Sequence, residues 1–559
     1  MRRTSFGTTR RLAATGIALL LLAAAGTAAP ARAAEPGGPA PLGRVVPAPA
    51  SVRPGGDPYE ITARTVVRVP PGNPEAARIG GYLAGLLRPS TGYRLPVLPG
   101  GTDGPGIRLV LDEGDEDGDG SGEGAGSGEG YRLSVTSRSV TISAREGAGL
   151  FHGVQTLRQL LPARAGSTAR QPGPWTVAGG VVTDAPRYGY RGAMLDVARH
   201  FFTVDQVKRY VDQLALYKYN ALHLHLSDDQ GWRIAVDAWP RLAGHGGSTQ
   251  VGGGPGGFYS KDDYREIVRH AASRYVTVVP EIDMPGHTNA ALASYARLNC
   301  DGVARPLYTG TEVGFSSLCV AKPDTYDFVE DVVGELAALT PGPYLHIGGD
   351  EAHSTSQADY AAFMDRVQPV VARHGKTVIG WHQLAGARPA PGALLQYWGY
   401  GGTGAAERAR VAAAARAGAG LILSPADRAY LDMKYTKDTP LGLSWAGLVE
   451  VRQSYDWDPG GYLTGVPATA VAGVEAPLWT ETISTSAQLE YMAFPRLAGI
   501  AELGWSPLAT HDWAAYRVRL AAQGPLWDEL GITYYRSPQV PWPDPSPGLR
   551  PGDKGRPRP

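Results

Sequence analysis

Two adjacent carboxylates, Asp350 and Glu351, follow a short apolar strand and a pair of glycines. Glycine allows the backbone to turn sharply or to approach a ligand closely. Neighbouring strand residues point to opposite faces, so the two carboxylates are expected to have different roles. Like charges this close raise the pKa of one of them, which suits a general acid. Most isolated Asp-Glu pairs are simply solvated, so a catalytic function depends on the rest of the chain.

Apolar segments and helical segments alternate after Pro186. A capping box at Thr203–Gln206 predicts the start of one helix. Eight strands with helices between them, over about 300 residues, predict a (β/α)8 TIM barrel of the α/β class. We place this domain at residues 186–536. The predicted strands are Gly192–Val197, Ala221–Leu226, Val276–Glu281, Tyr344–Ile347, Thr377–Trp381, Leu394–Trp398, Gly420–Leu423 and Val471–Ala476.

Carboxylates, one arginine and several tryptophans follow these predicted strands. The active site of such a barrel lies at the carboxyl ends of its strands. Tryptophan faces stack on the apolar faces of sugar rings, and carboxylates and arginine bind hydroxyl groups, so we predict a carbohydrate site. The residues are Asp196, Arg199, Asp228, Asp229, Trp232, Asp283, His287, Asp350, Glu351, Trp381, Trp398, Tyr430, Asp432, Trp445, Trp479 and Glu481.

The chain of 559 residues is long enough for two folded units with tails. A basic start, an apolar run and Ala31-Arg-Ala33 predict a secretory signal peptide over residues 1–34 and hence a secreted protein. Paired arginines leave the twin-arginine and Sec routes open. Short strands at residues 65–69, 107–111, 131–135 and 139–142 and helices at 74–87 and 149–161 predict a small α+β domain at residues 35–185. It contains a disordered acidic, glycine-rich loop at 112–130. Residues 537–559 are predicted to be a Pro-rich tail, disordered from Pro538 onward.

The charge and the cysteines limit the classes of partner. A net charge of +0 gives no electrostatic reason to expect binding to nucleic acid or to an acidic membrane surface. Cys300 and Cys319, the only cysteines, are expected to form a disulfide in an exported protein. Two free buried thiols are the alternative. The sequence has no zinc-ligand spacing, and a loop that starts like an EF-hand at Asp115 has Gly126 at its twelfth position, so we predict no metal and no cofactor.

Four ordered segments resemble those of glycoside hydrolase family 20, the β-N-acetylhexosaminidases, and above all its secreted actinobacterial members. The resemblance extends over the chain between the predicted signal peptide and the tail. Four motifs in order at consistent spacing are far more specific than one short pattern. The segments are residues 191–200, 223–233, 280–287 and 346–351.

This resemblance implies a retaining mechanism without a protein nucleophile, in which the 2-acetamido oxygen of the substrate attacks the anomeric carbon. Glu351 would be the general acid and then the base, and Asp350 would orient the acetamido group and stabilise the oxazolinium intermediate. Tyr430 would hydrogen-bond the acetamido oxygen. Asp228 and His287 would form a relay that sets the protonation of Glu351.

The resemblance also implies the residues that bind the sugar. Trp381, Trp398 and Trp479 would wall the pocket for the acetyl methyl and the ring. Arg199 and Glu481 would bind ring hydroxyls, with Asp432 and Trp445 near the 6-position. Outside this set, Asp283 is expected to stabilise a loop, and His346 and His353 to be structural.

The predicted function is therefore an exo-acting β-N-acetylhexosaminidase that removes terminal GlcNAc from the non-reducing end of chitooligosaccharides or other glycans. Tolerance of GalNAc, the natural substrate, the oligomeric state and the role of the first domain stay open. The alternatives are a disaccharide-releasing enzyme of the lacto-N-biosidase kind and a non-catalytic carbohydrate-binding protein. A metal-dependent deacetylase is disfavoured because no His/Asp cluster has ligand spacing.

Overall fold

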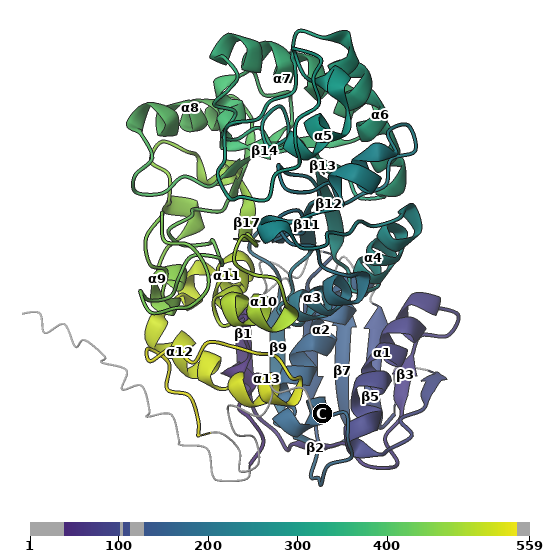
Figure 1. Ribbon diagram of the computed structural model, residues 1–559. Helices are drawn as coiled ribbons and strands as arrows, with labels where there is room; N and C mark the ends of the chain where they lie inside the picture. The colour runs from purple at the N-terminus through teal and green to yellow at the C-terminus, as the bar shows by residue number, and fades with distance from the viewer. Residues whose placement is uncertain (1–37, 101–103, 112–127, 545–559) are drawn as a thin grey trace, which may run out of the picture. The chain divides into compact units, whose positions relative to one another are not determined.

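A computed structural model describes residues 38–100, 104–111 and 128–544 (Figure 1). The chain divides into a short unit that ends at Gly38 and a compact unit, Pro39–Pro559, which contains all the described residues except Gly38. Its hydrophobic side chains form two main cores, one under an N-terminal sheet and one around a closed barrel. The predicted signal peptide lies outside the described residues.

The N-terminal part is a seven-stranded mixed sheet in the order β1-β9-β6-β7-β5-β3-β4, with a two-stranded ribbon, β2-β8, beside it. Helices α1 (Pro74–Thr91) and α2 (Gly147–Leu160) pack on this sheet. The α+β prediction is confirmed, although it missed β1, β2, β4, β8 and β9. The strands are β1 (Ser51–Pro54), β2 (Tyr59–Glu60), β3 (Val67–Val69), β4 (Val97–Pro99), β5 (Gly106–Leu111), β6 (Tyr131–Val135), β7 (Ser139–Ala144), β8 (Thr176–Val177) and β9 (Gly180–Asp184).

Eight parallel strands close into a barrel, in sequence order from β10 to β17, and confirm the predicted fold. Every predicted strand exists, and each end lies within two residues of the predicted one. Because helices cover the barrel, both faces of its strands are buried and read as apolar runs. The strands are β10 (Tyr190–Asp196), β11 (Ala221–His225), β12 (Thr277–Glu281), β13 (Tyr344–His346), β14 (Thr377–Trp381), β15 (Leu394–Tyr397), β16 (Gly420–Leu423) and β17 (Val471–Leu478).

Helix α3 (Val204–Leu216) begins at the predicted capping box, in which Thr203 and Gln206 bond each other's backbone N–H groups. A second capping box, Ser260 with Asp263, starts α4 (Lys261–Ser273). No helix in the described part of the chain combines the length and apolar character that crossing a membrane requires. The other helices are α5 (Asn289–Ser294), α6 (Pro323–Leu339), α7 (Gln357–Arg373), α8 (Ala405–Arg416), α9 (Val451–Tyr455), α10 (Ser486–Ala493), α11 (Arg496–Trp505), α12 (Trp513–Ala521) and α13 (Gly524–Glu529).

Two predicted irregular segments are ordered where the structure describes them. In the predicted tail, Val540 is buried and the ring of Trp542 lies 5.8 Å from that of Trp527 on α13. In the predicted loop 112–130, Glu129 pairs with the buried Arg191 of β10. Both predictions are therefore wrong at these residues, because an aromatic contact and an ion pair hold the chain. Residues 112–127 and 545–559 lie outside the described part.

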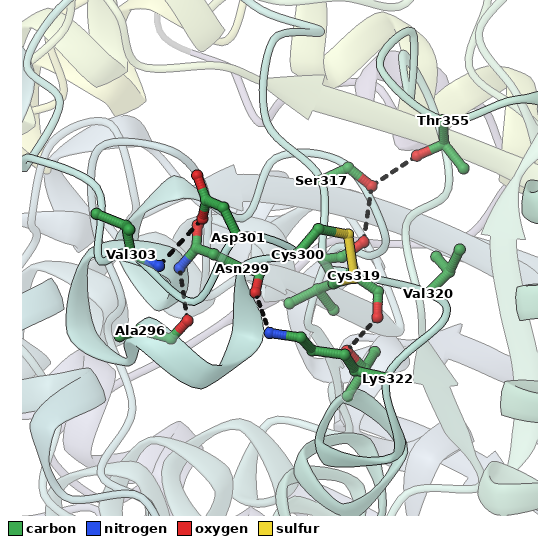
Figure 2. Close-up of a disulfide and its surroundings, with 12 residues drawn as sticks. Ala296, Asn299, Cys300, Asp301, Val303, Ser317, Cys319, Val320, Lys322 and Thr355 are labelled. Carbon is green, nitrogen blue, oxygen red and sulfur yellow. Dashed lines mark hydrogen bonds between the residues drawn. A yellow bond between two sulfur atoms is a disulfide. The ribbon is translucent and has the colours of Figure 1, made fainter.

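Cys300 and Cys319 form the predicted disulfide, so the free-thiol alternative is wrong (Figure 2). It closes a loop that follows α5 at the carboxyl end of the barrel. Within this loop, the hydroxyl of Ser317 lies 2.6 Å from that of Thr355, in the turn after β13. The disulfide loop is thereby held against the segment that carries Asp350 and Glu351.

Candidate active site

The turn after β13 places Asp350 and Glu351 on irregular backbone. Gly348 and Gly349 have φ angles of 62° and 99°, which favour glycine. A side chain at Gly348 would collide with the carboxylate of Asp283. The sequence predicted that strand alternation would separate the two acids. This is wrong, because the strand ends before them. Their surroundings separate them: Asp350 is buried, and the side chain of Glu351 is 28% exposed.

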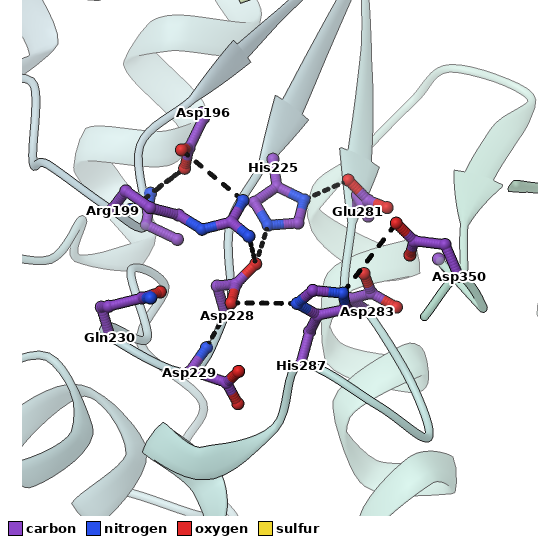
Figure 3. Close-up of polar contacts among 12 residues, drawn as sticks. Asp196, Arg199, His225, Asp228, Asp229, Gln230, Glu281, Asp283, His287 and Asp350 are labelled. Carbon is purple, nitrogen blue, oxygen red and sulfur yellow. Dashed lines mark hydrogen bonds and ion pairs between the residues drawn. The ribbon is translucent and has the colours of Figure 1, made fainter. Parts of the chain in front are cut away.

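A chain of ion pairs leads to Glu351. Figure 3 shows its part from Arg199 through Asp228 and His287 to the neighbouring Asp350. Asp228 binds Arg199 Nη2 at 2.8 Å and His287 Nδ1 at 3.2 Å. The other ring nitrogen of His287 lies 3.4 Å from Glu351 Oε2 and 3.9 Å from Asp350 Oδ2. The predicted relay residues are thus in contact, and His287 lies between Asp228 and both acids.

The pKa values separate the two acids, but not as the sequence predicted. Burial raises the pKa of Asp350 to about 6, and the Glu351 charge adds to this. Burial also raises the pKa of Glu351, but the hydrogen bond and charge of His287 outweigh it, so this pKa is lowered. Against its burial, the carboxylates of Asp228 and Asp350 hold the pKa of His287 well above its ordinary value. Asp350 is therefore the acid whose pKa is raised. Before substrate binds, the proton shared by His287 and Glu351 lies on His287.

Asp283 holds the turn, as expected, and also contacts Asp350. Its Oδ1 accepts the backbone N–H of Gly349 at 2.9 Å. Burial and the nearby Asp350 charge raise the pKa of Asp283 well above its ordinary value, so it carries a proton. Asp283 also hydrogen-bonds Asp350, which fixes the direction of the Asp350 carboxylate.

An aromatic wall faces these acids from the later strands. The rings of Trp381 and Trp479 lie 5.8 Å apart, and that of Tyr430 lies 6.3 Å from Trp479. Trp445 lies 5.9 Å from both Trp398 and Tyr430. Because Trp445 is 45% exposed and the others are buried or half-buried, the wall extends from the barrel interior to its mouth.

Several buried polar atoms of the site have no hydrogen-bond partner among the described residues. They include Nε and Nη1 of Arg199, Oδ1 of Asp350, both carboxylate oxygens of Asp432 and Nε2 of His287. Arg199 Nη1 has only an ion pair with Asp196, at 3.7 Å. Glu481 contributes negative charge beside both Arg199 and Asp432. Buried polar groups are nearly always paired, so a cluster of unpaired donors and acceptors indicates a site for a ligand with many hydroxyl groups.

Three residues of the predicted constellation serve the fold instead. Trp232 packs in the barrel core, with its ring 5.8 Å from that of Phe328. Asp196 accepts backbone N–H groups, including that of Arg199 at 3.0 Å. Asp229 accepts the backbone N–H of Asn289 at 2.9 Å. The predicted catalytic and substrate-binding residues, in contrast, all come to the carboxyl end of the barrel.

Sequence reasoning missed a buried polar network beneath the site. His223 and His225 alternate with leucines on β11, so both point into the barrel, where they meet Glu281 of β12. This alternation was the available signal, since polar residues at period two in a buried strand face a common interior. Glu475 of β17 binds His223 at 2.9 Å from the other side.

Four groups of histidines and carboxylates in the described residues bring possible metal-ligand atoms within 4.8 Å of one another. Three of the groups contain an acid and an imidazole that already hydrogen-bond, such as Glu281 with His225 or Asp228 with His287. In the fourth, His287 Nε2 forms an ion pair with Asp350 at 3.9 Å. Hydrogen bonding between acids and imidazoles therefore accounts for their closeness. The predicted absence of a metal stays a prediction.

Sequence comparisons agree with this architecture. The pattern of "Glycosyl hydrolase family 20, catalytic domain" matches residues 188–508, and that of "Glycosyl hydrolase family 20, domain 2" matches residues 43–185. A β-N-acetylhexosaminidase of Cellulomonas fimi is 43% identical over 502 residues, which are 89% of this chain and 96% of the relative.

Solved structures give the same result. The family 20 β-N-acetylhexosaminidase of Streptomyces coelicolor A3(2) is 70% identical, with a TM-score of 0.87, over 90% of this chain and 100% of that one. A mutant β-hexosaminidase of Streptomyces plicatus in complex with the product GlcNAc is also 70% identical, with a TM-score of 0.87, over 91% of this chain and 99% of that one. The chain therefore belongs to glycosyl hydrolase family 20.

Proposed function

We propose that this protein is an exo-acting β-N-acetylhexosaminidase that releases terminal β-linked GlcNAc with retention of configuration. The observation that carries the proposal is the place of Asp350, between the Glu351 relay and the aromatic wall. One of its oxygens has no partner among the described residues, while Asp283 hydrogen-bonds the carboxylate. A fixed, partly unpaired carboxylate beside apolar rings fits an acetamido group, which has an N–H and a methyl.

The substrate supplies the nucleophile. Its acetamido oxygen attacks the anomeric carbon, and the bond to the leaving oxygen breaks. Asp350 accepts the acetamido N–H and stabilises the positive charge that develops on the ring formed by this attack. Tyr430 donates its hydroxyl to the acetamido oxygen, and Trp381 and Trp479 enclose the methyl. Burial and the nearby charge of Asp350 raise the pKa of Tyr430 well above its ordinary value. Tyr430 therefore lies close to Asp350, which supports this placement.

Glu351 protonates the leaving oxygen. His287 and Glu351 share one proton, which rests on His287 because the pKa of Glu351 is lowered. As the glycosidic bond breaks, the leaving oxygen becomes the stronger base and takes this proton through Glu351. Glu351, now a carboxylate, then accepts a proton from the water that opens the intermediate. Asp228, held by Arg199 at 2.8 Å, keeps His287 oriented throughout.

Unpaired groups of the site bind the sugar hydroxyls. Arg199 offers Nε and Nη1, and Asp432 offers both carboxylate oxygens. Glu481, close to Arg199, binds a neighbouring hydroxyl. Trp398 walls the ring with the other tryptophans, and the exposed ring of Trp445 lies where the 6-position would reach the mouth.

The substrate class rests on the relatives. The Streptomyces plicatus enzyme has been seen with GlcNAc and with Thio-NAglucal. By similarity, terminal GlcNAc of chitin-derived or other glycans is the substrate here. We also propose that the protein is secreted: the N-terminal pattern and the Cys300–Cys319 disulfide both fit an oxidising compartment.

The test compares 4-nitrophenyl β-glycosides of GlcNAc and of glucose, with GlcNAc-thiazoline as inhibitor. We expect cleavage of the first only, with tight inhibition, since glucose has no acetamido group. Cleavage of both without inhibition would overturn the mechanism. Cleavage of neither would favour the disaccharide-releasing or the non-catalytic alternative, neither of which the comparisons support.

A further inference from the structure

A continuous chain of buried acids and imidazoles runs through the barrel interior and ends at the Glu351 relay. Figure 3 shows its part from Glu281 through His225 and Asp228 to His287. From its inner end, Glu475 binds His223 at 2.9 Å, and His223 binds Glu281 at 3.0 Å. Glu281 binds Nδ1 of His225, whose Nε2 lies 2.8 Å from Asp228 Oδ2. Asp228 is the acid that holds His287 in the relay. All of these side chains are buried, so no bulk water screens their charges.

Glu281 is the branch point of this chain. Its Oε2 accepts from His223 and His225, and its Oε1 accepts the indole N–H of Trp381 at 2.9 Å. Nδ1 of His346 also lies 3.0 Å from Oε1. One carboxylate therefore contacts both the path to Asp228 and a tryptophan of the aromatic wall, although it belongs to neither.

The charges along the chain alternate. The carboxylates on both sides of His225 outweigh its burial and hold its pKa well above the ordinary value, so it is a cation. His223 is similarly placed, and its pKa is raised to about 9. A cation at His225 offsets the charge of Asp228, which limits how firmly Asp228 holds the proton on His287. This cation exists only while Glu281 is a carboxylate.

We propose that Glu281 is a positioning residue for the reaction, which sets the proton supply of Glu351 through His225 and Asp228 and fixes Trp381 through its indole N–H. Glu281 does not touch the sugar. The inference rests on the proposed function, because it assigns a role within that reaction. The charged and titratable groups that face Glu281 are His223 and His225 of β11, His346 of β13, Asp350 after β13, Asp283 after β12 itself and Glu475 of β17.

The change Glu281→Gln keeps the shape of the side chain and removes its charge. His225 then loses a carboxylate and becomes neutral, so Asp228 holds the His287 proton more firmly. We expect kcat/KM to fall at least about tenfold more on di-N-acetylchitobiose, which needs protonation, than on 4-nitrophenyl β-GlcNAc, which needs little. The alkaline limb of the pH profile should move to higher pH. A merely structural defect would lower kcat/KM on both substrates by the same factor and would leave the alkaline limb of the pH profile in place. That result would overturn the proposal.

The second branch has its own readout. Trp381→Phe removes the indole N–H and keeps an aromatic wall. It should weaken inhibition by GlcNAc-thiazoline without changing the ratio of the kcat/KM values on the two substrates. Glu281→Gln keeps a carbonyl oxygen that can accept the indole N–H, so it should weaken inhibition by thiazoline less than Trp381→Phe does. If Trp381→Phe is inhibited as tightly as the unmodified protein, the link to Trp381 is wrong.

Glu475→Gln is the matched control. It also removes a buried carboxylate that binds His223, but Glu475 touches neither His225 nor Trp381. We expect lower stability with an unchanged substrate ratio, and a ratio that changes as much as in Glu281→Gln would overturn the special role of Glu281. Glu281→Asp keeps the charge, so its ratio of kcat/KM on the two substrates should lie closer to that of the unmodified protein than the ratio of Glu281→Gln does.

If Glu281→Gln does not fold, His225→Gln takes its place in the substrate series, because it breaks the same path one step nearer the site. The same two outcomes then decide the proposal. The unmodified protein separates this inference from the proposed function. If it does not cleave 4-nitrophenyl β-GlcNAc, the function is wrong; if it does and the variants lose activity uniformly, only the role of Glu281 is wrong.

Discussion

Two buried arginines lie near opposite ends of strand β10 and differ in how fully they are paired. Arg191, at the amino end, donates a hydrogen bond from each guanidinium nitrogen: Glu129 accepts from Nη1 and Nη2, Lys218 O from Nε and Tyr188 O from Nη1. Arg199, just past the carboxyl end, binds Asp228, but its Nε and Nη1 have no hydrogen-bond partner among the described residues. Both arginines stack on a tryptophan, so the difference is in hydrogen bonding alone.

The charged groups near each arginine show the same contrast. At the amino end, the buried Lys218 pairs with Asp184 at 3.1 Å. At the carboxyl end, Asp350 and Asp432 keep unpaired oxygens. Burying a polar group without a partner costs about 1 to 3 kcal/mol, so a fold retains such groups where a ligand supplies the partner. Unpaired charged groups therefore gather around Arg199 at the carboxyl end, although neutral atoms beside Arg191, such as His152 Nδ1 and Trp505 Nε1, are also unpaired.

The largest effect should come from Glu351 at the carboxyl end. Glu351→Gln removes the proton donor and should lower kcat on chitobiose by about 10²- to 10⁴-fold, the usual contribution of general acid catalysis. The loss on 4-nitrophenyl β-GlcNAc should be smaller in the first step, because that leaving group needs little protonation. The measurement is steady-state kinetics on both substrates, with a thermal unfolding curve. Equal losses on both would count against the acid assignment.

Asp350→Asn should cost roughly 2 to 4 kcal/mol of transition-state stabilisation on every GlcNAc substrate, as for loss of one preorganised electrostatic partner. The pH profile sharpens this test. Asp350 has a pKa of about 6, so it is ionised above that pH and neutral below it. The rate of the unmodified protein should therefore rise as pH increases through about 6, and the Asn variant should lack this rise. An unchanged rate would refute the role of Asp350.

The amino end should show the opposite behaviour. Arg191→Met leaves Glu129 without its cation, and removing one partner of such a pair costs about 3 kcal/mol of folding stability. Because Arg191 lies far along β10 from the site, kcat/KM should be unchanged at a temperature where the variant is folded. Chemical denaturation and kinetics measure the two quantities. A variant of normal stability and reduced activity would break the contrast between the two ends.

A chelator should have no effect. If the acid–imidazole pairs beneath the site hold protons and not a cation, activity on 4-nitrophenyl β-GlcNAc should survive dialysis against EDTA. Re-addition of Zn²⁺ or Ca²⁺ should not raise it. Loss of activity on dialysis, restored by one cation, would make the groups around Glu281 or His287 a metal site and would revive the deacetylase alternative.

The barrel could be predicted because its strands are continuous apolar runs with helices between them. The capping box at Thr203 located a helix start for the same local reason. Strands β1 and β9 were missed because their pattern depends on a partner far along the chain, since Ser51 pairs with Thr183. Such pairing leaves no local signal.

The site could be predicted only in part. Its residues follow from strand ends and from family resemblance, but their charge states depend on neighbours from other strands. The lowered pKa of Glu351 requires His287 from the segment after β12, which no local pattern reveals. Glu281 was missed because it is the last residue of an apparently ordinary strand, and its four neighbours come from β11, β13 and β14.

The backbone at Glu351 has a φ of 42°, a region that glycine and asparagine occupy far more easily than glutamate. The cost of such a conformation is about 1 to 3 kcal/mol. A population of this protein selected only for folding would therefore lose glutamate at position 351, in favour of glycine or asparagine. Glutamate at position 351 serves the chemistry of the site at the expense of the stability of the fold. These two demands on the chain conflict most directly at this position.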